Sequence, residues 1–380
     1  MKRFLKWCLH LVAALAILLV LFHVVENWRG KHAWEVYQRE REAKGDSFEW
    51  KSVTPPPVPN AENFAMTPLF AELFPKPPER PKLEAFRLPY ATGAAGNWQA
   101  CRVENLEAWK RCFTNDDLLA ALKVYEPMMR EISVALQQRP KCRFPIRYED
   151  GVKMLLPHLA WLRNATRVSQ LRALEELSAG QTDAAFEDAR VCSRLADTIK
   201  DEPTLLSFLV RVTMLNAAAQ VVWEGLAAHR WNEWQLAAFQ AEFSNADQLA
   251  MYALTMRGER LFGYSGARWL IENPKERMEI LQAGNLYFDG NSVRHGEETL
   301  WSKFIAFMCF RVTIPTGWWY QNLLSFDRMH TETIWLLINL EHRRLDPAMW
   351  RSTAKNFREM PFTPFNFTRS LSKNSLVSFE

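Results

Sequence analysis

Several motifs and residue types are scarce or missing from this chain of 380 residues. Their absence removes most of the sequence signals by which a catalytic, metal-binding or cofactor-binding site is recognised. Only 14 residues are glycine, which argues against many tight hairpins and against glycine-rich phosphate loops. No Cys-x-x-Cys, His-Glu-x-x-His, Gly-x-x-x-x-Gly-Lys or Gly-x-Gly-x-x-Gly pattern occurs. We therefore predict no catalytic residue, no metal ligand and no cofactor, and we leave an enzymatic activity open without favouring it.

Net charge is also small. The formal charge is +4, and three of the cations, Lys2, Arg3 and Lys6, precede one apolar run, so the rest of the chain is nearly neutral. Such a balance lacks the basic footprint of a nucleic-acid-binding protein, and we predict no nucleic-acid partner.

The apolar run, from Trp7 to Val25, contains no Asp, Glu, Lys or Arg. As a helix it is roughly 28 Å long, which matches the hydrocarbon core of a bilayer. Trp7 and Trp28 stand where interfacial aromatic residues are expected. The run therefore predicts a transmembrane helix that contacts membrane lipid. No second run of this length occurs, because Arg211 and Asn216 interrupt residues 205–222, so one pass is expected.

The leading cations indicate the orientation of this helix. By the positive-inside rule the N-terminus is expected in the cytoplasm and the body outside it; in a bacterium this corresponds to a helix in the inner membrane and a body in the periplasm. A cleaved signal peptide is the alternative, but it needs small residues after the apolar core, and Phe22-His23-Val24-Val25-Glu26 is bulky there. An uncleaved signal-anchor is favoured.

Composition then divides the chain into four parts. Residues 1–27 form a cytoplasmic stub and the signal-anchor, 28–96 a juxtamembrane helix and a proline-rich linker or strap, 97–360 a helical exoplasmic domain, and 361–380 an irregular tail. Ten of the 20 prolines lie within residues 55–89, which favours extended chain. A free linker is the leading interpretation, and a strap laid on the body is the alternative. The strap is favoured for its middle by apolar residues, Phe64, Leu69, Phe70, Leu73 and Phe74.

Helical periodicity dominates the exoplasmic part, and the predicted fold class is all-α, an irregular helical array. Residues 171–200 resemble one tetratricopeptide-type helix pair with Gly180 at the turn, but a solenoid needs about three or more such units. A small hairpin is expected near residues 286–293. The helices are expected near 114–138, 149–178, 183–200, 203–229, 231–243, 246–272, 297–310 and 317–344, after a juxtamembrane helix over 28–44 that Gly45-Asp46 ends.

One stretch resembles a known group of proteins. Trp34 and Tyr37 are followed by Gly45-Asp46, Pro55-Pro56-Pro57-Val58-Pro59, Asn63-Phe64-Ala65 and Pro68. This pattern is similar to the juxtamembrane region of uncharacterised, single-pass, helix-rich membrane-anchored proteins of planctomycete and verrucomicrobial bacteria. The resemblance implies a location and a helical build, and no activity. Many of those proteins end in a Pro-x-Asp-Pro-type tail, whereas Pro361-Phe362-Thr363-Pro364 here lacks the aspartate.

Five cysteines lie outside the apolar run, at 101, 112, 142, 192 and 309. An oxidising compartment permits disulfides, and Cys101, Cys112 and Cys142 are the candidates for pairing. Free, buried cysteines in a helical core are the alternative.

Three residues are candidates for ligand binding. Arg257 and Arg260 lie one helical turn apart over small residues, and two guanidinium groups so placed can hold a carboxylate or phosphate. His330 interrupts an apolar stripe and can line a pocket. The alternative for each is a partner within the core, such as a carboxylate on a neighbouring helix.

These features support three functional hypotheses. The leading one is a membrane-tethered helical interaction or scaffold module of the bacterial envelope, with an envelope protein as a possible partner. The alternatives are a hydrolase of an envelope polymer, with carboxylates in a helical cleft, and a sensor of an anionic ligand that uses the two arginines.

Overall fold

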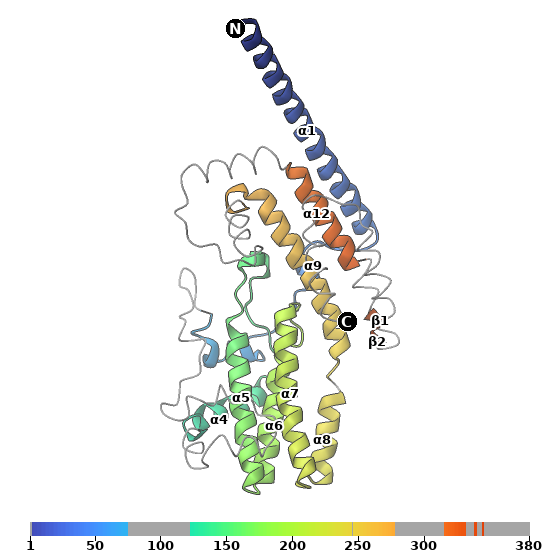
Figure 1. The fold of residues 1–380 in the computed structure, drawn as a ribbon. Coiled ribbons are helices and arrows are strands. Elements are labelled where there is room, and N and C mark those ends of the chain that lie inside the picture. The colour runs from blue at the N-terminus through green and yellow to red at the C-terminus, as the bar shows by residue number, and fades with distance from the viewer. Residues whose placement is uncertain are drawn as a thin grey trace. The chain divides into compact units, whose positions relative to one another are not determined.

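A computed structural model describes residues 2–74, 122–244, 246–277 and 315–331, together with the pairs 338–339 and 344–345 (Figure 1). The chain divides into two compact units. Unit 1 comprises residues 1–52 and 260–380, and unit 2 comprises residues 53–259. The fold is all-α, as predicted, with one short pair of strands in unit 1. The units do not follow the four linear parts expected from composition, because the juxtamembrane helix packs on residues some 290 positions later in the chain.

Three α-helices make up most of the described part of unit 1. Helix α1 (Lys2–Ala43) packs along α12 (Thr316–Met329), and the last part of α9 (Gln248–Glu272) belongs to the same unit. The apolar run and the juxtamembrane helix form one unbroken α1, as expected. It ends where Gly45 adopts a φ of +89°, a conformation that suits glycine, so the predicted stop is confirmed.

An aromatic cluster forms the core of unit 1. Trp34 and Tyr37 of α1 pack with Phe48, with Tyr264 of α9 and with Leu323 of α12. The rings of Trp34 and Tyr264 stack with their centroids 5.7 Å apart. Residues that resemble a juxtamembrane motif in the sequence are therefore core residues of a folded unit.

Unit 2 is a helical bundle. Its described α-helices are α4 (Glu126–Gln138), α5 (Pro157–Ser178), α6 (Thr182–Asp197), α7 (Leu205–Ala227) and α8 (Glu233–Ser244), and the first part of α9 follows. Helix α6 packs against α4, α5, α7 and α8 (Figure 1). Two apolar clusters fill the unit, one centred on α4, α5 and α6 and one between α5, α6, α7 and α8.

Local sequence signals explain these helices well. Thr204 caps α7, since its side chain accepts a hydrogen bond from the backbone N–H of Ser207 at 3.1 Å. Gly180 has a φ of +75° at the end of α5, and the backbone N–H of Gln181 returns to the carbonyl of Glu176. This turn reverses the chain into α6, so the helix pair predicted around Gly180 is present.

The proline-rich segment is a strap as far as the structure describes it. Short 3-10 turns at Phe64–Met66 and Pro68–Phe70 bring Phe64, Phe70 and Leu73 into the main core of unit 2. Phe70 meets Trp161 of α5 with a centroid distance of 4.7 Å. The leading interpretation, a free linker, is therefore wrong for residues 53–74. Burial removes the surface of these apolar side chains from water, which stabilises the packed strap relative to an extended chain exposed to solvent.

Several predicted boundaries also differ. The helix expected over 317–344 ends at Met329, and strands β1 (Ile338–Asn339) and β2 (Arg344–Leu345) pair antiparallel beyond it. The helix expected from residue 149 begins at Pro157, after a 3-10 segment (Tyr148–Lys153) in which Gly151 has a positive φ. The predicted helix over 297–310, the hairpin near 286–293 and the tail lie outside the described residues.

Two of the described helices are long and apolar enough to cross a membrane. In α1 no residue of the apolar window is buried, and its mean hydropathy is 2.7. Helix α7 has a window of lower hydropathy, 1.6, which is partly buried in unit 2. Its Arg211 is buried and donates to Asp197 of α6 at 2.8 Å, which is the behaviour of a core helix.

Candidate functional site

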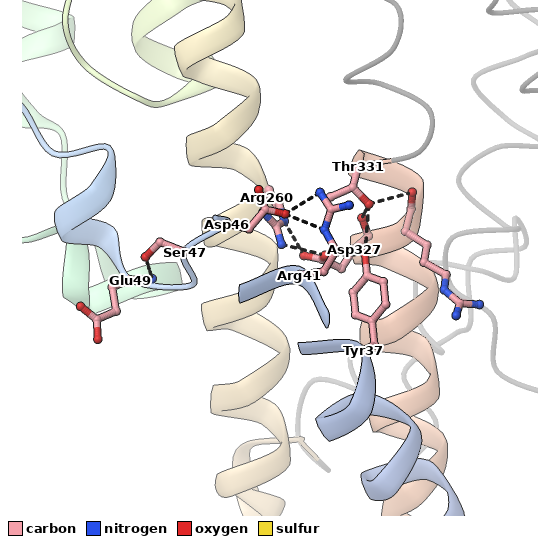
Figure 2. Close-up of polar contacts among 9 residues, drawn as sticks. Tyr37, Arg41, Asp46, Ser47, Glu49, Arg260, Asp327 and Thr331 are labelled. Atoms are coloured by element: carbon pink, nitrogen blue, oxygen red, sulfur yellow. Dashed lines mark hydrogen bonds and ion pairs between the residues drawn. The ribbon is translucent and has the colours of Figure 1, made fainter. Parts of the chain in front are cut away.

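The most connected polar cluster of unit 1 contains one of the predicted ligand-binding residues, Arg260. Its guanidinium group donates two hydrogen bonds to the fully buried carboxylate of Asp327, one from Nε at 2.7 Å and one from Nη2 at 3.0 Å (Figure 2). Such a bidentate pair has the geometry in which arginine binds carboxylates most strongly. Arg260 is thus committed to an internal partner.

Helix α1 joins the same carboxylate. The Tyr37 hydroxyl donates to Asp327 Oδ2 at 2.9 Å and lies 3.0 Å from the Thr331 hydroxyl (Figure 2). Burial, with the negative charge of Asp327 as a further cause, raises the pKa of Tyr37 to about 12. Tyr37 therefore stays a neutral donor at physiological pH, and three N–H or O–H groups converge on Asp327.

The end of α1 supplies a second carboxylate. Arg41 donates to Asp46 Oδ2 at 2.6 Å, and Nη1 of Arg260 lies 3.4 Å from the same oxygen. The Arg260 guanidinium carbon also sits 4.6 Å from the centre of the Phe48 ring. Two arginines and two carboxylates therefore form a continuous ion-pair network that ties α1, α9 and α12 together within unit 1.

His330 lies beside this network. The residue is buried, its ring packs on Phe326 with a centroid distance of 4.6 Å, and its Nδ1 has no hydrogen-bond partner within the described residues. Burial and the nearby positive charge of Arg260 lower the pKa of His330 to about 4. The imidazole is neutral near pH 7, so it does not contribute a positive charge to an anion site.

The predicted anion site is not assembled at Arg260. Arg257 is exposed and belongs to unit 2, whereas Arg260 belongs to unit 1 and donates to Asp327. The alternative stated for these arginines, a carboxylate partner on a neighbouring helix, is thus confirmed for Arg260. Asp327, Tyr37 and Asp46 were not predicted as its neighbours. Helical spacing, the signal that selected Arg260, carries no information on residues 67 or more positions away.

A second polar cluster is buried in unit 2 around Glu202. Its Oε1 lies 2.8 Å from His158 Nε2, and its Oε2 accepts a hydrogen bond from Ser207, which also contacts Thr204. The His158 ring stacks on Phe144 with a centroid distance of 4.1 Å. Burial, together with the Glu202 charge, raises the pKa of the nearby Tyr148.

This cluster does not have the order of a nucleophilic triad. In such a triad the imidazole lies between the hydroxyl and the carboxylate, whereas here the Glu202 carboxylate lies between His158 and Ser207. His158 and Ser207 are fully buried. We interpret the cluster as a hydrogen-bond network that stabilises the turn before α7.

Unit 2 also contains a cavity of about 630 Å³, within the range of ligand sites. We refer to it as the strap cavity, because Pro55, Pro56 and Val58 of the proline strap form one wall. The end of α4, the segment 139–142 that follows it and the end of α6 form the others. Phe64, Leu136 and Pro140 complete its apolar lining.

Charge is unevenly distributed around the strap cavity. Four cationic side chains line it against two carboxylates, those of Asp197 and Asp201. Asp197 is paired with Arg211 at 2.8 Å. Of the cations, Arg139 donates to backbone carbonyls and Lys141 pairs with Glu62, while Arg194 and Lys200 have no side-chain hydrogen bond or ion pair to any residue that the structure describes.

Two cysteines outside α1, Cys142 and Cys192, lie among the described residues, and Cys142 lines the strap cavity. Cys142 and Cys192 are free thiols, and burial raises the pKa of both. Cys101, Cys112 and Cys309 lie outside the described residues. Within the described ranges, no group of three or more His, Cys, Asp or Glu side chains is placed to hold a metal ion.

Comparison with protein-family models, with curated proteins and with solved structures finds no match for this chain.

Proposed function

We propose that this protein is a single-pass, membrane-tethered interaction module of the bacterial envelope, and that its partner binds in the strap cavity. The observation that carries the interaction role is the cavity itself, an apolar-walled space in which Arg194 and Lys200 have no partner among the described residues. The excess of cations favours an acidic segment of a partner protein. The resemblance to membrane-anchored helical proteins agrees with this role.

Helix α1 supports the tether. Large apolar side chains of this helix are exposed from Trp7 to Val25, and from Trp34 onward the helix packs into the core of unit 1. An exposed apolar helix of this length is stable in lipid and costly in water. We place the N-terminus in the cytoplasm and both units in the periplasm. Protease added to intact spheroplasts should digest both units, and protection of them would overturn this topology.

Affinity capture tests the interaction role. Full-length protein is extracted from envelopes in mild detergent, and the proteins captured with it are identified by mass spectrometry. The Arg194→Glu and Lys200→Glu variants should lose the partner that the wild type recovers, because each reverses a charge at the cavity. Arg130→Glu is the matched control, since Arg130 is exposed, pairs with Glu126 of the same helix, and does not line the cavity. Equal recovery by all four proteins would exclude the cavity as the binding site.

A second candidate is a hydrolase of an envelope polymer, because Asp197 and Asp201 line the same cavity. Paired carboxylates are the usual catalysts of such reactions. Asp197 is paired with Arg211, so Asp201 is the only carboxylate of the lining without an ion-pair partner among the described residues, which favours binding over hydrolysis. Release of soluble fragments from purified cell-wall polymer by the wild type, but not by Asp201→Asn, would reverse that preference.

A further inference from the structure

We propose that the first turn of α12 is a second lipid-contacting element, which rests in the headgroup region of the leaflet from which α1 emerges. Trp318 and Trp319 are its contacting residues. The inference rests on the proposed membrane tether and goes beyond it, because it assigns a lipid contact to a segment some 290 residues away from the apolar run.

The contact between the helices reaches into the apolar run itself. The ring of Trp318 meets that of Phe22 edge to face at 6.1 Å, and its Nε1 donates to Glu26 Oε2 at 2.9 Å. The backbone N–H of Gly317 donates to the Asn27 side chain at 2.8 Å. The start of α12 is therefore fixed at the outer end of the run.

The depth of this contact follows from helix geometry. Phe22 lies three residues before Val25, the last residue of the charge-free run, so its level is about 4.5 Å inside that end. If the run spans the hydrocarbon core, Trp318 sits at the boundary between acyl chains and headgroups. Tryptophan is enriched at this boundary, because its ring is apolar and its N–H forms hydrogen bonds.

Neighbouring residues have the same interfacial character. Trp28 is exposed on α1 near the same level and stacks on His32. The Arg277 guanidinium group lies 5.3 Å from the centre of the Trp319 ring, so a cation accompanies the aromatic pair. Indole rings with an arginine beside them suit a zwitterionic or anionic phospholipid headgroup better than water or a dry protein surface.

The contact is confined to the first turn of α12. The two helices run in the same direction, because Gly317 meets Glu26 and Asn27 while Asp327 meets Tyr37. Ten residues of helix separate these contacts, which is about 15 Å along the axis. Arg328, which is exposed, therefore lies well outside the headgroup region and provides a control position on the same helix.

Photocrosslinking tests this inference. Full-length protein carrying p-benzoylphenylalanine at one position is reconstituted into phosphatidylcholine nanodiscs and irradiated, and lipid adducts are quantified by mass spectrometry. The label replaces Trp318 or, in a second variant that keeps the tryptophan, Thr316. Val20 is the positive control inside the apolar run, and Arg328 is the negative control.

We expect lipid adducts from the labels at Val20, Trp318 and Thr316, several-fold above the level at Arg328. Adducts at Val20 without any at Trp318 or Thr316 would overturn the lipid contact of α12 and leave the tether intact. Equal adducts at Thr316 and Arg328 would also overturn it, because the contact would not be confined to the first turn. The absence of adducts at Val20 would instead refute the tether.

Discussion

At the scale of single residues, the carboxylate of Asp327 depends on its neighbours to compensate its buried charge. It is fully buried and accepts hydrogen bonds from two nitrogens of Arg260 and from the Tyr37 hydroxyl. A buried ion pair contributes modest net stability, but removal of one partner leaves the other charge buried without compensation. Each member of this cluster should therefore be sensitive to substitution.

The first prediction concerns this pair. Asp327→Ala should lower the free energy of unfolding by about 3–5 kcal/mol, because Arg260 remains with a largely buried charge and no bidentate acceptor. The measurement is urea unfolding of the full chain in detergent, followed by tryptophan fluorescence. Glu126→Ala is the control, since it breaks an exposed pair with Arg130 that contributes about 0.5 kcal/mol or less. Equal losses in the two variants would contradict the role of the cluster.

The second prediction concerns pH. The pKa of His330 is lowered to about 4 in the fold, so between its ordinary value of 6.5 and pH 4 the unfolded chain binds more protons than the native one. This difference makes stability fall as the pH decreases through that window, by up to about 1.4 kcal/mol per pH unit. Unfolding measured at pH 7 and pH 4.5 should therefore show a smaller decrease for His330→Leu than for the wild type.

Phe326→Leu controls for lost packing, because Phe326 contacts the His330 ring and does not titrate. This variant should have a lower free energy of unfolding than the wild type at both pH values. The decrease in its stability between pH 7 and pH 4.5 should equal that of the wild type. If His330→Leu also keeps the full wild-type decrease, another group is responsible for it.

At the scale of elements, the crossing of α1 and α12 depends on two glycines. A Cβ atom added at Gly30 would lie 2.0 Å from the backbone oxygen of Gly317, and one added at Gly317 would lie 1.9 Å from the backbone oxygen of Glu26. The obstacles are backbone atoms, which cannot rotate away as a side chain can. Only glycine permits the two backbones to approach this closely.

The third prediction follows from this crossing. Gly30→Ala should separate the helices at a cost of about 3 kcal/mol, the upper part of the range for overpacking. Hydrogen–deuterium exchange of α12 peptides should become faster. Lys31→Ala changes the next, exposed residue and should leave exchange unchanged. Unaltered protection of α12 in Gly30→Ala would show that the helices do not cross at this point.

At the scale of the whole molecule, two described helices are apolar enough to span a membrane, and only one is proposed to do so. The apolar side chains of α1 are exposed all round in its first part, whereas α7 places one face in the core of unit 2 and buries Arg211 there. A core helix of a large bundle has the second pattern, and a lipid-facing helix has the first.

The fourth prediction distinguishes these helices. Leu15→Arg places a charge in the middle of the apolar run, which costs about 2.5–3.5 kcal/mol for membrane insertion. The fraction of protein that remains with membranes after alkaline carbonate extraction should therefore decrease. Leu206→Arg, at an exposed leucine of α7, should leave this fraction unchanged. An equal decrease in both variants would indicate a second span.

Much of the architecture was predictable from the sequence because it depends on neighbouring residues. The unbroken apolar helix, the stop at Gly45, the turn at Gly180 and the helices of unit 2 all follow from hydropathy, periodicity and capping, which act over a few residues. Arg260 and His330 were singled out for the same reason, by their spacing on a helix.

Only the tertiary structure decided how these pieces are used. In the structure, side chains of the proline strap belong to the core of unit 2, and Arg260 binds the carboxylate of Asp327. The start of α12 lies against the end of the apolar run. The physical reason is that burial and ion pairing depend on which distant segments meet, and periodicity describes only one segment at a time. Hydropathy alone thus determined that the chain has a long apolar helix near its N-terminus, and long-range packing decided which residues surround the end of its apolar run.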